Sequence, residues 1–202
     1  RREGKTPVLS GEEMRQLLDA IGTDNLRDLR DRALFATLAY AFPRISTALA
    51  LRVADFESSS GGWTLYLKGK GGEAHRHAVH HEAAEWLNDW LEAAALHNQR
   101  EAFIFQAIGP PRGTDQKILH RAMSRTSAFE MVKRRARDQG LNPALCTHSF
   151  RATGVTAYVE AGGALETAAR MAGHADVRTT QLYVRKVERS LQSEVERIRF
   201  GK

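Results

Sequence analysis

A histidine and an arginine three residues apart, His148 and Arg151, open the part of the sequence best suited to chemistry. On a helix this spacing puts both side chains on one face. A second such pair occurs at His97–Arg100, so the pair alone has little weight. Only the first pair is followed by His174, 23 residues after Arg151, and then by Tyr183, nine residues later. These four side chains could together bind and attack a phosphodiester.

A phosphodiester carries its charge on two non-bridging oxygens, and cleavage adds negative charge there and on the leaving oxygen. Positive hydrogen-bond donors, a nucleophile and an acid are therefore required. Arginine is always charged and binds two oxygens at once. Histidine donates hydrogen bonds or transfers protons. A tyrosine has an ordinary pKa of about 10, so it needs nearby positive charge to ionise as a nucleophile.

At this point the sequence resembles the catalytic domain of the tyrosine recombinases, the phage integrase family. The pattern from His148 through Arg151 and Gly-His174 to Tyr183 resembles the second motif of that family. Arg44, at the start of the segment 44–56, resembles its first motif, and Lys70 in Lys68-Gly-Lys70-Gly-Gly resembles its lysine on a β-hairpin. The resemblance extends from about Thr6 to Arg189, with every motif in family order.

Two positions depart from the family pattern. Phe42-Pro43 stands where a glycine–leucine-like pair usually precedes the first arginine, and Thr47 stands where a glutamate is common. Both departures bear on the local turn that aims Arg44.

The resemblance implies a function and a catalytic set. Tyr183 would attack the phosphate and become linked to the 3′ end of a DNA strand, while Lys70 would protonate the departing 5′ oxygen. Neither ATP nor a metal ion nor another cofactor is needed, because the covalent link conserves the bond energy. The expected activity is site-specific DNA recombination or integration. The implied catalytic residues are Arg44, Lys70, His148, Arg151, His174 and Tyr183.

Other interpretations stay open from the residues alone. Tyr183 could be a tyrosine packed in the core, as we expect for Tyr158, Tyr40 and Tyr66, and Lys68 competes with Lys70 for the lysine role. The domain could be an inactive DNA-binding module of the same fold or a relative of type IB topoisomerases.

Four neighbouring histidines raise a further alternative, a metal site. We expect them to form a polar strand end near DNA instead, because glutamates are the only carboxylates close to them in the sequence. They are His75, His77, His80 and His81.

Charge is distributed unevenly along the chain. The net charge is +6, yet residues 1–100 carry −1 and residues 101–202 carry +7. A local basic zone on a near-neutral body suits a polyanionic partner, although a solvated basic helix face would look the same. Double-stranded DNA is the expected partner. The candidate DNA-binding residues are Arg112, Lys117, Arg121, Arg125, Lys133, Arg134, Arg135 and Arg137.

Composition excludes several protein classes. The single cysteine, Cys146, excludes a disulfide scaffold and a multi-cysteine zinc site. The longest apolar stretch, residues 33–42, is about half of a membrane span, and no signal-peptide pattern opens the chain. We therefore expect a cytoplasmic protein, at the bacterial nucleoid or encoded by a phage or mobile element.

The elements that must position the candidate residues follow from periodicity and breaks. Pro43 predicts that a helix stops before it and that a new first turn begins with Arg44. Strands are predicted near 53–57, 63–67 and 75–79, around a glycine-rich turn. Helices are predicted near 11–21, 25–41, 81–97, 124–138, 148–160, 164–172, 177–184 and 187–199. The expected fold is α+β and mostly helical, a tyrosine-recombinase-like domain with a small three-stranded antiparallel sheet.

Three segments are expected along the chain. Residues 1–5 read as a linker remnant, 6–186 as the catalytic domain, and 187–202 as a C-terminal helix that docks on a neighbouring protomer. The resemblance also implies an N-terminal DNA-clamping domain, which this sequence lacks, and a homo-oligomer on DNA, in a tetrameric synapse.

Overall fold

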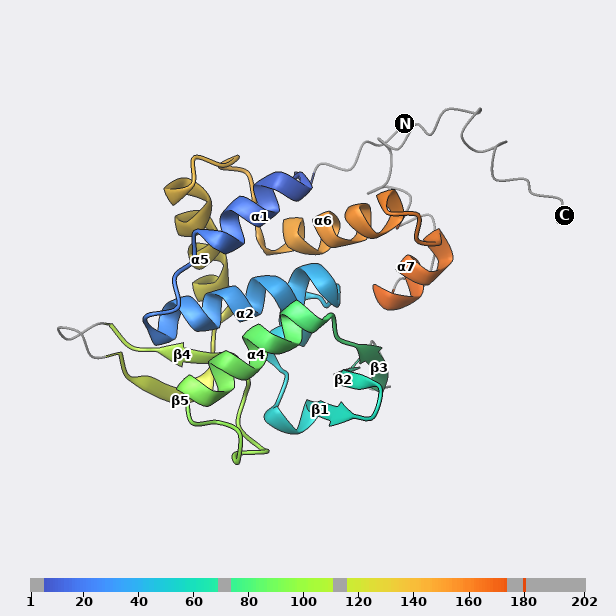
Figure 1. Ribbon diagram of the computed structural model, residues 1–202. Coiled ribbons are helices and arrows are strands. Elements are labelled where there is room, and N and C mark those ends of the chain that lie inside the picture. Colours follow the sequence, from blue (N-terminus) through green and yellow to red (C-terminus); the bar gives the residue numbers. More distant parts are fainter. Residues whose placement is uncertain (1–5, 69–73, 111–115, 174–179, 181–202) are drawn as a thin grey trace, which may run out of the picture.

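The computed structural model describes residues 6–68, 74–110, 116–173 and 180 (Figure 1). Helices make up most of this part and surround one continuous apolar core. The predicted helices at 177–184 and 187–199 lie outside the described residues, apart from Thr180. The described helices are α1 (Gly11–Asp19), α2 (Leu26–Tyr40), α3 (Ile45–Leu49), α4 (His81–Ala93), α5 (Arg125–Asp138), α6 (Thr147–Glu160) and α7 (Leu165–Met171).

Helix α1 begins where the sequence places a capping box. The Ser10 hydroxyl accepts a hydrogen bond from the Glu13 amide at 3.1 Å, and the Glu13 carboxylate accepts one from the Ser10 amide at 2.7 Å. Both amides would otherwise lack a partner at the helix start. Helix α1 then buries Met14, Leu17 and Leu18, as the apolar spacing predicts.

Helix α2 is the centre of the domain. Its apolar residues are buried all around the helix, because α4 packs on one side and α6 on another (Figure 1). Phe35 of α2 stacks on Phe150 of α6, with ring centroids 4.3 Å apart. This contact fixes α6, which carries the candidate residues His148 and Arg151, to the core.

The three-stranded sheet has the predicted antiparallel topology. It consists of β1 (Phe56–Ser59), β2 (Gly62–Lys68) and β3 (Ala74–Ala78), with β2 in the middle. Leu65 of β2 pairs with Phe56 on one side and with His77 on the other. The first strand starts later than predicted, because Val53–Asp55 form a 3₁₀ turn whose Asp55 carboxylate accepts a hydrogen bond from the Arg52 amide.

A second hairpin was not predicted. Strands β4 (Gln106–Ile108) and β5 (Ile118–Ala122) pair antiparallel with an irregular register. Each is short, and β5 exposes three of its five residues, so neither has a clear alternating pattern. The hairpin holds Lys117 and Arg121 of the basic zone. Among the described residues, no helix is both long and apolar enough to cross a membrane.

Candidate active site

The turn that aims Arg44 follows directly on α2. The predicted break is confirmed: α2 ends at Tyr40, and Arg44 is the residue immediately before the first helical residue of α3. At this break Phe42 takes a left-handed conformation, with φ 55°. This conformation favours glycine, which the family usually has near this point.

The side chain of Phe42 compensates for its backbone conformation. The ring is buried and packs with Val155, Ala168 and Ala172 in a small second apolar cluster. Its space depends on Gly154 of α6, because a Cβ there would lie 2.6 Å from the ring and 1.8 Å from the Ala39 carbonyl oxygen. The glycine thus lets α6 approach the end of α2 closely.

Arg151 is buried at this junction. Its side chain leaves α6 and donates one hydrogen bond from Nη1 to the Phe42 carbonyl and another from Nη2 to the Ala172 carbonyl, the latter at 2.6 Å. The residue is only 2% exposed. Its guanidinium therefore ties the turn before Arg44 to the segment that leads from α7 toward His174.

His148 lies one turn before Arg151 on α6 and has an electrostatic environment of its own. The residue is exposed, yet protein atoms crowd part of the ring, and this desolvation lowers its pKa. The positive charges of Arg151 and then Arg44 lower the pKa further. Because Coulomb interactions fall with distance, Arg151 and Arg44 both lie close enough to His148 for their charges to act on its ring. The neutral imidazole is therefore the main form at pH 7.

Arg44 is the solvent-accessible arginine beside His148 and Arg151. It is exposed, and the structure records no hydrogen bond or ion pair between its guanidinium and another residue in the described ranges. Its backbone carbonyl accepts the hydrogen bond from the Ala48 amide that starts α3. The arrangement brings together one buried arginine, one neutral histidine and one accessible arginine.

The other three predicted catalytic residues, Lys70, His174 and Tyr183, lie outside the described residues. Lys68 is described: it ends β2, is exposed, and lines a small cavity together with Ser46 and Thr47 of α3. Strand β2, which ends at Lys68, therefore lies against α3, the helix that follows Arg44.

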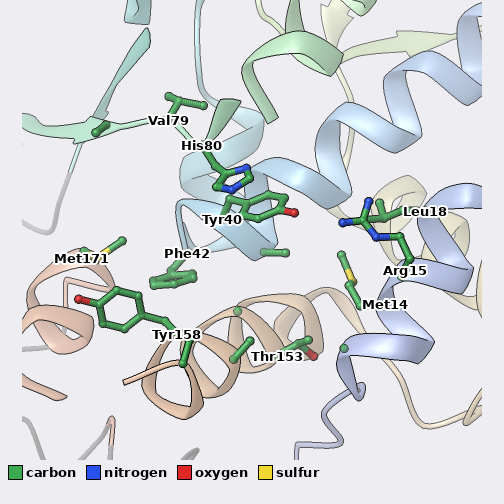
Figure 2. Close-up of a pocket in the computed structure, with 16 residues that line it drawn as sticks. Met14, Arg15, Leu18, Tyr40, Phe42, Val79, His80, Thr153, Tyr158 and Met171 are labelled. Carbon is green, nitrogen blue, oxygen red and sulfur yellow. The ribbon is translucent and has the colours of Figure 1, made fainter. Parts of the chain in front are cut away.

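Phe42 also lines an apolar cavity of about 610 Å³ (Figure 2). Met14, Leu18 and Met171 line it, and Tyr158 points into it, with its ring edge-on to Phe42 at 6.5 Å between centroids. Tyr158 is half-buried, in keeping with the packing role expected for it.

Of the four clustered histidines, His80 lines this cavity and packs against Tyr40 and His81. The His80 ring stacks on Tyr40 with ring centroids 4.3 Å apart, and the His81 ring lies tilted against it at 4.2 Å. Tyr40 donates a hydrogen bond to the Glu82 carboxylate, and burial followed by this bond raises the pKa of Tyr40 to about 12. Among the described residues, no three potential ligands converge on a metal position.

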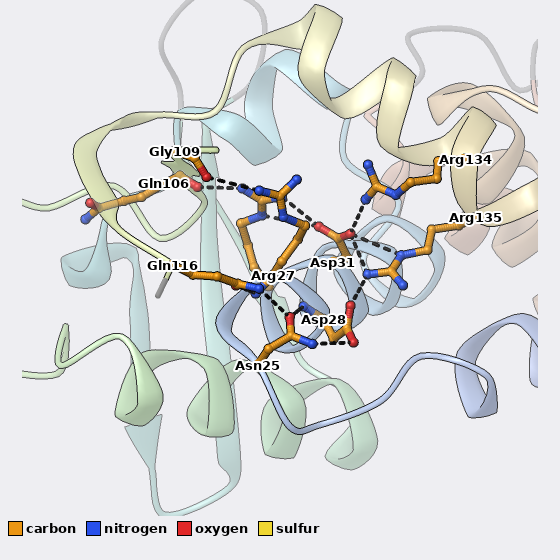
Figure 3. A network of polar contacts seen from close by, with 10 residues as sticks. Asn25, Arg27, Asp28, Asp31, Gln106, Gly109, Gln116, Arg134 and Arg135 are labelled. Carbon is orange, nitrogen blue, oxygen red and sulfur yellow. Dashed lines mark hydrogen bonds and ion pairs between the residues drawn. The ribbon is translucent and has the colours of Figure 1, made fainter. Parts of the chain in front are cut away.

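The structure divides the basic zone into two sets. Arg134 and Arg135 of α5 both donate to the carboxylate of Asp31, which is fully buried in α2 (Figure 3). Arg30 donates to the same carboxylate at 2.8 Å. These contacts give Arg134 and Arg135 a structural role that the sequence did not indicate.

The remaining basic side chains lie closer to solvent. Lys133 donates to the Pro143 carbonyl at 2.6 Å and lies over the exposed ring of Phe129. Arg112 is outside the described residues. The exposed members of the zone are Lys117, Arg121, Arg125 and Arg137.

Comparison with known proteins gives a consistent result. The family model described as "Phage integrase family" matches residues 7–189. Tyrosine recombinase XerC of Escherichia coli is 29% identical over 175 residues, which cover 85% of this chain and 53% of that protein. The chain thus spans about half the length of the curated relatives it matches.

Solved structures show the same fold. The XerA recombinase aligns with a TM-score of 0.75 at 20% identity, covering 99% of this chain and 67% of that one. The XerH recombinase, solved with its difH substrate in a pre-cleavage complex, aligns with a TM-score of 0.71 at 22% identity, covering 96% and 53% of the two chains. The predicted fold class is confirmed.

Proposed function

Because this chain belongs to the phage integrase family, we propose that it cleaves and rejoins DNA strands in site-specific recombination. The observation that carries the proposal is the convergence of Arg44, His148 and Arg151 at the junction of α2, α3 and α6. The two arginines carry permanent positive charge, so this junction would bind the negative charge of a phosphodiester.

The two arginines would act differently. Arg151 has both terminal nitrogens held by carbonyl oxygens, so it would present a fixed positive charge with little reorganisation during the reaction. Arg44 is exposed, so it would close on a non-bridging oxygen when DNA arrives. An arginine that stabilises a phosphoryl transition state contributes roughly 10³–10⁵ in rate.

His148 would serve as a neutral group. With its pKa below the ordinary value of 6.5, the ring has one N–H to donate and one nitrogen to accept a proton at pH 7. It could donate to the phosphate or accept the proton of an attacking hydroxyl. Phosphate binding would add negative charge nearby and raise this pKa again.

The roles of the remaining residues rest on the family motifs. Tyr183 would attack the phosphorus and displace the 5′ oxygen, forming a 3′-phosphotyrosyl bond. Lys70 would give its proton to that oxygen, and His174 would donate to the phosphate. The 5′ hydroxyl of another strand would then reverse the step, so one ester bond is exchanged for another and no ATP is consumed.

Binding and assembly belong to the same proposal. The exposed basic residues would contact the phosphates of double-stranded DNA, in the cytoplasm of a bacterial host. Several copies would assemble on DNA, with residues 187–202 of one copy docking on the next. A domain elsewhere in the full protein would clamp the DNA.

Covalent trapping tests the chemistry. On a nicked duplex the short 5′ fragment diffuses away after attack, so the wild-type chain should stay linked to DNA through denaturing electrophoresis. Tyr183→Phe should abolish the linked species, and Tyr158→Phe, at a half-buried tyrosine on α6, should retain it. Trapping that survives Tyr183→Phe would overturn the assignment of the nucleophile.

An inactive DNA-binding module is the competing function. The sequence favours this module through Phe42-Pro43, because this pair could direct Arg44 away from the other candidate residues. With Phe42 in the left-handed conformation, Arg44 is exposed at the start of α3, which supports the catalytic function. Wild-type chain that binds the nicked duplex but never becomes linked to it would favour the module.

A further inference from the structure

A second place with excess positive charge lies between α2, the β4–β5 hairpin and α5. It is a cavity of about 170 Å³, which we call the arginine notch. It shares no lining residue with the site around Arg44, His148 and Arg151. Its charged and hydroxyl-bearing lining residues are Arg27, Arg30, Arg121, Ser127, Glu130 and Arg134.

Hydrogen bonds hold the arginine side chains at the bottom of the notch in place. Arg30 is 5% exposed, and all three of its guanidinium nitrogens donate, two to Asp31 and one to the Gln106 carbonyl. Arg134 is held by Asp31 through Nη2 alone, at 3.0 Å. Figure 3 shows Asp31 between the arginines of α2 and those of α5. The arginine side chains are thus positioned before any ligand arrives.

The wall and rim offer donors that the protein itself does not use. Arg27 donates one hydrogen bond, from Nη2 to the Gly109 carbonyl at 3.1 Å. Arg121 of β5 is exposed, and the structure shows no hydrogen bond or ion pair from it to any residue it describes. Ser127 adds a hydroxyl at the first turn of α5.

The charge balance favours an anion. Including Arg135 and Asp28, which share the network, five arginines face three carboxylates, Asp28, Asp31 and Glu130. Two positive charges therefore remain without a counter-charge in this group. The volume is more than ten times the roughly 10–15 Å³ that admits one water, so a phosphate group fits.

We propose that the arginine notch binds one backbone phosphate of DNA, away from the phosphodiester that is cut. The inference rests on the proposed function. A phosphate seated there would accept hydrogen bonds from Arg121, Arg27 and Arg134 and would fix the register of the duplex on the protein without reading its sequence. Glu130 opposes this charge and weakens the contact.

The salt dependence of DNA binding tests the notch. Each phosphate contact contributes about 0.9 to the slope of log K against log salt concentration. Arg121→Gln, measured by fluorescence anisotropy on an uncut duplex, should make the slope shallower by about 0.9. Arg27→Gln/Arg121→Gln should give the same change and not twice as much, because both side chains serve one phosphate.

Matched variants separate the notch from general surface charge. Arg100→Gln removes an exposed arginine outside the notch, paired with Glu57, and should leave the slope unchanged. Glu130→Gln should tighten DNA binding severalfold with no change in slope. Thermal unfolding of each variant would check that the fold is intact. An unchanged slope in Arg121→Gln, or a change as large in Arg100→Gln, would overturn the proposal.

Two further readouts separate the possible outcomes. The first readout is the protection of the DNA-free protein against heat by inorganic phosphate. If phosphate protects the wild type but not Arg121→Gln, and the salt slopes of DNA binding are equal in the two proteins, the notch binds free phosphate and the proposal of a DNA phosphate is wrong. A wild type that never traps but shows the predicted slopes would overturn the proposed function and leave the notch standing.

Discussion

The protein buries arginines in two regions and holds their charge in two different ways. Around Asp31, three guanidinium groups share one fully buried carboxylate, and opposite charges stabilise one another. At the end of α2, the terminal nitrogens of Arg151 are held by the Phe42 and Ala172 carbonyls. A carbonyl oxygen holds a guanidinium in place without adding a negative charge, whereas the Asp31 carboxylate adds one.

The difference predicts different consequences when a charge is removed from each region. In the Asp31 network, the removal of the carboxylate should cost stability. At the Arg151 junction, the removal of the arginine should cost activity beyond any effect on stability. The lowered pKa of His148 belongs to the second region, where positive groups face one another.

The largest effect is expected for Arg151→Gln. The transition state would lose a fixed positive charge, so the rate of covalent trapping at saturating DNA should fall by roughly 10³-fold or more. Two buried carbonyls would also lose donors, at about 1–3 kcal/mol each in the free energy of unfolding. Urea unfolding and trapping, measured on the same preparations, separate the two losses. A folded variant that traps at the wild-type rate would remove Arg151 from the catalytic set.

Asp31→Asn tests the other side of the comparison. Three arginines would then crowd around a neutral amide, and the free energy of unfolding should fall by roughly 3–5 kcal/mol, as when one partner of a buried ion pair is removed. Urea denaturation measures the loss. At saturating DNA and a temperature where the variant is folded, its trapping rate should equal that of the wild type. A thousandfold loss of trapping would place Asp31 in the functional site as well.

Gly154→Ala should destabilise the junction that holds Arg151. Its Cβ would meet the Ala39 carbonyl oxygen at 1.8 Å, so α6 must move away from α2, at a cost of about 1–3 kcal/mol. Gly61→Ala is the matched control, because a Cβ there meets nothing within 4 Å. Thermal unfolding compares the two variants, and equal melting temperatures would show that the close approach of α2 and α6 is unimportant.

The smallest effect concerns Tyr40 at high pH. Its pKa is raised from 10.0 to about 12 in the folded protein, so folding favours the protonated form. This contribution to stability is fully present below pH 10 and is lost as the pH rises toward 12. Tyr40→Phe should therefore flatten the fall of the unfolding free energy between these values. A Tyr40→Phe variant whose unfolding free energy falls as steeply as that of the wild type over this range would contradict this role of Tyr40.

Much of the fold was predictable because local signals agree with the tertiary structure. The Ser10–Glu13 box, the break before Pro43 and the pairing of β2 with β3 each depend on residues that are close in the sequence. The β4–β5 hairpin was missed because its short strands have no clear pattern. The left-handed Phe42 was missed because its ring is accommodated by Gly154, which is 112 residues away in the sequence.

For the candidate site, three of the six predicted residues lie in the described part of the chain, and their roles stay predictions. The motif spacing predicts His148 and Arg151 as site residues, and in the structure the charges of Arg151 and Arg44 both act on His148. Net charge could not distinguish Arg134 and Arg135 from Arg121, because their difference depends on Asp31, a carboxylate about a hundred residues earlier in the chain. Arg27 was missed for the same reason, since it lies outside the basic zone and reaches the notch only through the fold.

The titration of His148 tests the central claim most directly. In the DNA-free protein, histidine NMR should give a pKa for His148 below 6.5, and Arg44→Gln should raise it toward that value. Binding of a duplex should raise it as well, since a phosphate would then lie among the three groups. A His148 pKa that changes neither with Arg44→Gln nor with DNA would show that Arg44, His148 and Arg151 do not share one phosphate.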